Sequence, residues 1–111
     1  MTFEEAAAEA LAFRDARDWA QFHNPKDLAL SVSLEAAELL EVFQWSGADL
    51  EVVDRQAEAA EELADVLIYC IYLADRLGVD PAEIVDAKVK TNEERYPVAK
   101  ARGNARKYTE L

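Results

Sequence analysis

Two apolar segments with helical spacing flank a short polar turn near residue 50, and each carries two acidic residues three positions apart. The first pair is Glu35 and Glu38, and the second pair is Glu62 and Asp65. Residues three apart lie on the same face of a helix. If the segments pair as an antiparallel hairpin, Glu38 faces Glu62 and Glu35 faces Asp65. The pattern therefore predicts four carboxylates that converge between two central helices.

Residues typical of helix ends divide the chain into four predicted helices. Asn24-Pro25 and Asp80-Pro81 each place a capping residue before a proline at the first helical position. Gly78 matches a left-handed helix end. No segment has the alternation of a strand, so we predict an all-α, four-helix-bundle-like subunit with antiparallel central helices. The expected helices span residues 2–22, 25–45, 51–77 and 81–95, and an irregular tail follows over 98–111.

Chain length and apolar content bound the assembly. With 111 residues the chain forms one domain, which we assign to residues 1–97 together with the basic tail 98–111. The predicted apolar stripes of the central helices include Leu40 and Leu67. A chain this short leaves apolar helix faces uncovered, which favours a homo-oligomer.

The charge and the cysteine count exclude several classes of protein. A formal net charge of −11 argues against binding of a nucleic-acid polymer. The apolar run over residues 63–77 contains charged residues, so it is not a membrane span. The acidic N-terminus lacks a signal-peptide pattern, and Cys70 has no partner cysteine. These features predict a cytoplasmic protein.

The acidic cluster has two interpretations. Four converging carboxylates stay ionised together only around a cation, and oxygen ligands favour Mg²⁺, with Mn²⁺ as a substitute. His23 is the only histidine, which argues against a di-iron centre. In the other interpretation the acids are a solvated helix surface, and the protein is a non-catalytic helical interaction module that binds a basic partner.

Five blocks of the chain resemble, in order, the all-α nucleotide pyrophosphohydrolases of the MazG type. The closer similarity is to the dCTP pyrophosphatase branch of that family. The resemblance covers nearly the whole chain, and its most specific elements are residues 17–25, 35–45, 62–69, 88–97 and 102–110.

The resemblance implies an activity and a site. Enzymes of this type hydrolyse nucleoside triphosphates between the α and β phosphates, giving a monophosphate and pyrophosphate. By similarity, Glu35, Glu38, Glu62 and Asp65 would bind Mg²⁺, and Glu41 is a candidate for orienting the attacking water. The expected substrate is dCTP or a related pyrimidine deoxynucleotide. The enzymatic alternative is a pyrophosphohydrolase of broad specificity, or one that acts on purine or modified nucleotides. Members of this size form tetramers with sites between subunits, so we expect a homotetramer, with a dimer as the alternative.

The same resemblance assigns residues that contact the nucleotide. The expected contacts to the base and sugar are Trp19, Gln21, Phe22, His23, Trp45 and Tyr69. The expected contacts to the phosphates are Lys88, Asn92, Arg95, Arg106 and Lys107, within a basic stretch that otherwise balances an acidic protein. One departure concerns Ala10, because vertebrate members of the branch carry a histidine nine residues before the matching tryptophan. The turn over residues 46–54 is also shorter than in those relatives.

Overall fold

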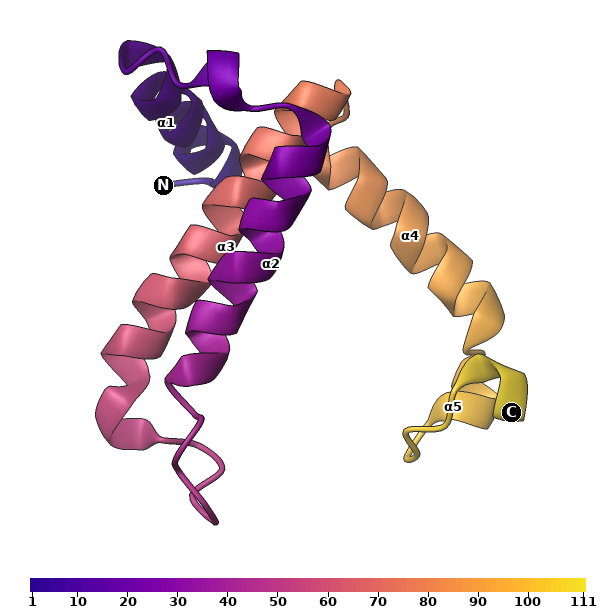
Figure 1. Ribbon diagram of the computed structural model, residues 1–111. Coiled ribbons are helices and arrows are strands. Elements are labelled where there is room, and N and C mark those ends of the chain that lie inside the picture. Colours follow the sequence, from indigo (N-terminus) through magenta and orange to yellow (C-terminus); the bar gives the residue numbers. More distant parts are fainter. The chain divides into compact units, whose positions relative to one another are not determined.

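A helical hairpin forms the centre of the first part of the chain. In the computed structural model, which describes residues 1–111, α2 (Pro25–Glu41) and α3 (Gln56–Leu77) run antiparallel and pack together (Figure 1). α1 (Phe3–Ala16) packs against α3. These elements belong to one compact unit, Met1–Gly78, and Val79–Leu111 form a second unit. The predicted all-α class and the antiparallel central helices are confirmed.

Side-chain caps set the helix ends as the sequence predicts. Oδ1 of Asn24 accepts the backbone N–H of Asp27 at 2.9 Å at the start of α2. Oδ1 of Asp80 does the same for Ala82 at 3.0 Å at the start of α4 (Pro81–Arg95). Gly78 ends α3 with φ +70°, a conformation that glycine adopts without steric cost.

The first helix is shorter than predicted, because it ends at Ala16 rather than near Phe22. The amide of Trp19 donates to the carbonyl of Arg14, and the amide of Asp18 donates to the carbonyl of Asp15. Asp18 has φ +53°, so these bonds form a left-handed helix end with aspartate in the place usually taken by glycine. A short 3-10 turn, η1 (Ala20–Phe22), then leads to α2.

The turn of the hairpin is longer than predicted. α2 ends at Glu41 rather than near Trp45, and α3 begins at Gln56 after the 3-10 turn η2 (Val53–Arg55). Buried Val52 holds a left-handed conformation with φ +48°, and Oδ1 of Asp49 accepts its amide at 3.1 Å. A residue in the left-handed conformation cannot continue a right-handed α-helix, so α3 begins only after Val52. The conformation is unfavourable for a β-branched residue, and the sequence therefore does not indicate this break.

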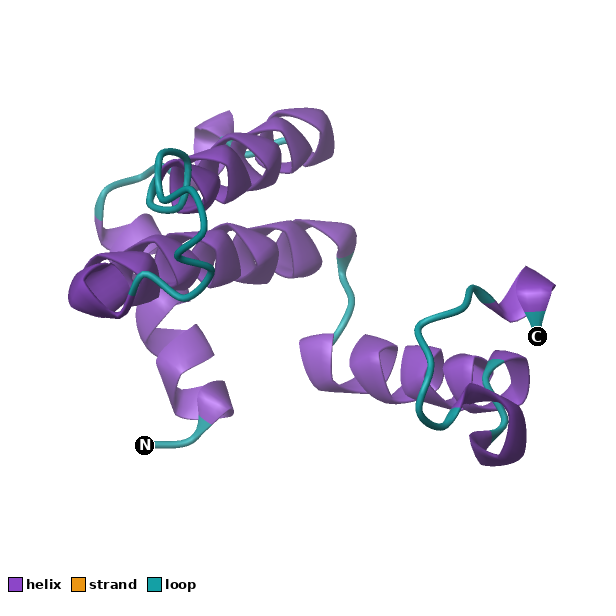
Figure 2. Ribbon diagram, turned by 90° about the horizontal axis from the view of Figure 1, so that it is seen from below, coloured by secondary structure: helices purple, strands orange, loops and turns teal.

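The second unit contains α4, a short α5 (Val98–Ala101) and the 3-10 turn η3 (Tyr108–Glu110), which Figure 2 shows as helical segments joined by loops. The prediction of an irregular tail is therefore wrong at these two segments. The Tyr96 and Tyr108 rings pack edge to face with centroids 5.9 Å apart, and the Arg95 guanidinium lies 4.9 Å from the Tyr108 ring centroid. Aromatic contacts thus order part of the tail. None of the helices combines the length and the apolar character needed to cross a bilayer.

The core of the first unit is small, and much apolar surface is exposed. Leu28, Ile71 and Tyr72 are buried where the hairpin helices meet and where α1 covers α3. Leu40 and Leu67, which we predicted within the apolar stripes, are instead 67% and 45% exposed. Three helices in this arrangement cover only part of each helix, so the remaining apolar positions face outward.

Arg14 fastens α1 to α3. Its side chain is buried, and Nη1 donates to Oδ2 of Asp75 at 2.8 Å. The guanidinium lies 5.7 Å from the ring centroid of Tyr72, whose hydroxyl donates to the carbonyl of Ala10 at 3.0 Å. These contacts hold α1 in place against the central hairpin.

We expect Arg14→Met to lower the free energy of unfolding by about 1–2 kcal/mol, because the ion pairs of Arg14 with Asp15 and Asp75 are lost while both half-exposed carboxylates stay hydrated. Urea denaturation followed by circular dichroism measures the change. Arg76→Met is the matched control, since Arg76 is exposed on α3 and takes part in none of the chain's four ion pairs. Equal stability of the two variants would contradict the role assigned to Arg14.

Candidate metal centre

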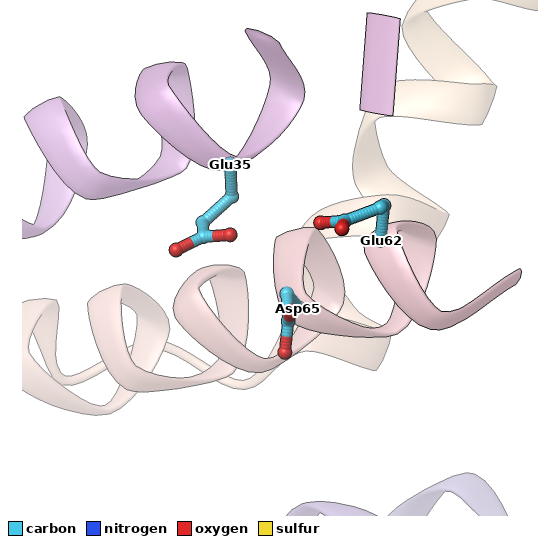
Figure 3. A group of neighbouring side chains, drawn as sticks. All are labelled: Glu35, Glu62 and Asp65. Atoms are coloured by element: carbon cyan, nitrogen blue, oxygen red, sulfur yellow. The ribbon is translucent and has the colours of Figure 1, made fainter. Parts of the chain in front are cut away.

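Three carboxylates from the two central helices converge. Glu35 projects from α2 toward α3, where Glu62 and Asp65 are one helical turn apart (Figure 3). One oxygen from each side chain lies within 4.8 Å of the corresponding oxygens of the other two. The hairpin produces this arrangement, since its antiparallel register brings residues equally distant from the turn opposite one another.

The environment of these groups disfavours their charged forms. Oε2 of Glu35 and Oε2 of Glu62 are both buried, and neither has a hydrogen-bond partner. Burial, together with repulsion from the neighbouring carboxylate of Glu38, raises the pKa of Glu35 to about 7. Burial and the neighbouring carboxylates of Glu38 and Asp65 also raise the pKa of Glu62. The cluster therefore holds more negative charge than the chain itself neutralises.

Glu38 and Glu41 lie at the edge of this cluster. Glu38 is exposed on α2, close enough to Glu35 and Glu62 to raise the pKa of both. Glu41, at the last position of α2, is also among the charges that raise the pKa of Glu62. The structure thus places the fourth predicted ligand and the predicted water-orienting acid next to the three converging carboxylates.

The cluster fits a hard divalent cation. All the available donor atoms are carboxylate oxygens, which Mg²⁺ and Mn²⁺ prefer. None of the four ion pairs in the chain involves a cluster residue. A buried carboxylate oxygen without a partner costs free energy, and a cation bound at the cluster would offset that cost.

A cleft of about 580 Å³ adjoins the cluster, between α1 and α3. Asp65 lines this cleft and also belongs to the three converging carboxylates, so the two features are contiguous. Trp19 and Tyr69, two of the predicted base contacts, line its wall. Phe13 and Tyr72 line it too and were missed by the sequence analysis. The helical spacing of apolar residues on α1 is the signal that could have indicated Phe13.

The other predicted base contacts lie outside the cleft lining. The side-chain amide of Gln21 donates to Asp18, and Phe22 is exposed. The imidazole of His23 stacks on Tyr72 with ring centroids 5.3 Å apart, and its Nδ1 is buried without a partner. Burial and the nearby Arg14 charge lower the pKa of His23. Trp45 is 89% exposed in the hairpin turn and does not line the cleft.

Comparison with known proteins places the chain in a family. Residues 30–111 match the MazG-like family. The chain belongs to the MazG-like family. It is 43% identical to dCTP pyrophosphatase 1 of Mus musculus and 42% identical to that of Homo sapiens, over 99% of this chain and 68% of each relative. A crystal structure of a pyrophosphatase from Archaeoglobus fulgidus is 47% identical and matches with a TM-score of 0.77, over 85% of this chain and 91% of the other. The predicted resemblance is confirmed.

In this MazG-like chain the predicted phosphate contacts all lie in the second unit. Lys88, Asn92 and Arg95 are on α4 with spacings of four and three residues, so they share one face of the helix. Arg106 and Lys107 precede η3. The roles of these residues, like those of the acidic and aromatic residues, stay predictions.

Proposed function

We propose that this protein hydrolyses deoxynucleoside triphosphates, dCTP or a related pyrimidine nucleotide among them, to the monophosphate and pyrophosphate. Membership of the MazG-like family and 42–43% identity to curated dCTP pyrophosphatases over nearly the full chain support this activity. The observation that carries the proposal is an acidic cluster without a basic partner, which adjoins a cleft lined by aromatic side chains. A triphosphate needs a cation and a base needs a flat apolar surface, and the two features supply both.

We assign the cation, Mg²⁺ with Mn²⁺ as a substitute, to Glu35, Glu38, Glu62 and Asp65. When bound, it stabilises the negative charge that develops on the phosphate oxygens. The oxygen of a water molecule forms a bond to the α phosphorus as the water releases a proton to the solution. The bond from that phosphorus to the bridging oxygen breaks, and pyrophosphate leaves. Glu41 orients the attacking water, and Trp19 and Tyr69 hold the base in the cleft. Lys88, Asn92, Arg95, Arg106 and Lys107 bind the phosphates in this proposal.

A homotetramer in the cytoplasm completes the proposal. Both hairpin helices expose apolar side chains. For example, Leu40 on α2 is 67% exposed and Leu63 on α3 is 48% exposed. Exposed apolar area on this scale favours association with further copies. In such an assembly the exposed Trp45 of one copy is available to the cleft of another, which accounts for its distance from the cleft in its own chain.

Product analysis tests the activity. We expect ³¹P NMR to show monophosphate and pyrophosphate from dCTP with Mg²⁺, and no turnover with EDTA. In ¹⁸O-labelled water the label is expected in the monophosphate, because the attack is on the α phosphorus. Release of inorganic phosphate, or no turnover of any nucleotide with Mg²⁺ or Mn²⁺, would contradict the proposal.

A further inference from the structure

One acidic residue interrupts the apolar face that α1 turns toward the cleft. The α1 residues that line the cleft recur at helical spacing and are Phe3, Ala6, Glu9, Ala10 and Phe13. All but Glu9 are apolar. None of the four ion pairs in the chain involves Glu9, so no basic side chain neutralises it. A charged residue on this face has no evident role in packing α1.

The rest of the cleft offers few groups that recognise a base by hydrogen bonding. Asp65 belongs to the acidic cluster, and the Tyr72 hydroxyl already donates to the Ala10 carbonyl. The Tyr69 hydroxyl can both donate and accept, so it does not distinguish an amino group from a carbonyl, and the Trp19 indole N–H cannot accept from an amino group. Aromatic rings such as Trp19 stack on any base, because every base has a flat face. Glu9 is therefore the one carboxylate of the cleft that is free to contact the base edge.

We infer that Glu9 is a specificity-determining residue, which selects nucleotides whose base carries an exocyclic amino group, as cytosine does, over thymine and uracil. An ionised carboxylate only accepts hydrogen bonds, and the N4 amino group of cytosine is a donor that suits it. Thymine and uracil present a carbonyl oxygen at the same position, which a carboxylate repels. This inference rests on the proposed function, because it places the base in the cleft beside the acidic cluster.

Glu9 also compensates for a small side chain next to it. Ala10 offers no polar side-chain atom, so the wall of the cleft at this point has no other hydrogen-bonding group on α1. A site that bonds a particular polar group rejects analogues lacking it more strongly than an apolar pocket does. Discrimination between cytosine and thymine on this wall of the cleft then depends on Glu9.

Competition between two substrates tests the inference. An equimolar mixture of dCTP and dTTP is given to the full-length protein with Mg²⁺, and the ratio of dCMP to dTMP formed is measured. This ratio does not depend on the fraction of active protein. We expect Glu9→Gln to lower the ratio by about tenfold, since the amide also donates to the thymine O4. The control Glu4→Gln, on α1 but outside the cleft, keeps the wild-type ratio.

A titration without metal separates this inference from the proposed function. Wild-type protein in EDTA is expected to bind dCMP more tightly than dTMP by isothermal titration calorimetry, and Glu9→Gln is expected to lose the difference. Turnover by the wild type with an unchanged product ratio in Glu9→Gln would overturn the role of Glu9 alone. If the wild type hydrolyses no nucleotide, the proposed function fails, and equal binding of dCMP and dTMP then overturns the inference as well.

Discussion

Glu62→Gln is expected to lower kcat/KM for dCTP by at least about a thousandfold, because a lost ligand removes several kcal/mol of charge stabilisation. The same variant is expected to leave the metal-free protein as stable as the wild type or more stable. Oε2 of Glu62 is buried without a partner, and burial together with the neighbouring carboxylates raises the pKa of the group. Glutamine keeps the shape of the side chain and removes its charge.

The two opposite effects separate a functional residue from a structural one. Loss of activity through misfolding would come with a lower melting temperature, whereas loss of a cation ligand would not. Steady-state kinetics with Mg²⁺ and thermal melts in EDTA measure both quantities on the same preparation. Glu51→Gln is the matched control, since Glu51 is an exposed acid in the hairpin turn. A Glu62→Gln enzyme with turnover within tenfold of the wild type would remove Glu62 from the metal centre.

The convergence of carboxylates from the two central helices could be predicted, because it follows from two simple properties of the sequence. The acidic pairs are equally distant from a turn near residue 50, and antiparallel helices bring such positions opposite one another. The structure accordingly places one carboxylate oxygen each of Glu35, Glu62 and Asp65 within 4.8 Å of the other two. Local capping chemistry was just as informative, since Asn24 and Asp80 begin their helices as predicted.

Two of the errors, at the end of the first predicted helix and at the start of the third, came from backbone conformations that the residue type does not indicate. Asp18 and Val52 both adopt positive φ, and each interrupts a segment whose composition favours a helix. Glycine at either position would have indicated the break. Asp18 and Val52 adopt positive φ because hydrogen bonds of the surrounding backbone, and for Val52 also burial, hold them in this conformation.

The cleft could not be predicted from the sequence, because it depends on how α1 packs on α3. Periodicity shows which α1 residues share a face but does not show what that face meets. In the sequence Glu9 is one of many acidic residues, and nothing in the sequence marks Tyr72 as a cleft residue and not a core residue. Only the tertiary arrangement places both at the wall of one cavity.

We expect Mg²⁺ to stabilise the protein against heat, and to do so more strongly as the pH rises through the pKa of Glu35. At a concentration one hundred times its Kd, a ligand that binds only the folded state contributes about 2.7 kcal/mol. For a domain of this size that corresponds to a rise in Tm of roughly 10 °C at about pH 8. At about pH 5.5 the rise is expected to be less than half as large, because protons compete with the cation for Glu35.

The sign of the pH effect without metal follows from the same group. The pKa of Glu35 is raised from an ordinary value of 4.5 to about 7, so between these values the folded state binds more protons than the unfolded state. The free energy of unfolding in EDTA therefore falls as the pH rises across this window. His23 acts in the opposite direction, because its lowered pKa favours folding as the pH rises toward its ordinary value.

Comparison with Glu35→Gln isolates the contribution of Glu35, since that variant retains His23 and lacks the titrating carboxyl. Thermal melts by differential scanning fluorimetry across this pH range are expected to show, in EDTA, a Tm that falls less with rising pH in the variant than in the wild type, or that rises, because the contribution of His23 is then unopposed. The additional stabilisation by Mg²⁺ is expected to depend less on pH in the variant than in the wild type. A wild-type Tm in EDTA that rises between about pH 5 and about pH 7 in parallel with that of Glu35→Gln would contradict the expected role of Glu35. The carboxyl would then titrate alike in the folded and unfolded chains, and the cluster would not be poised to bind a cation.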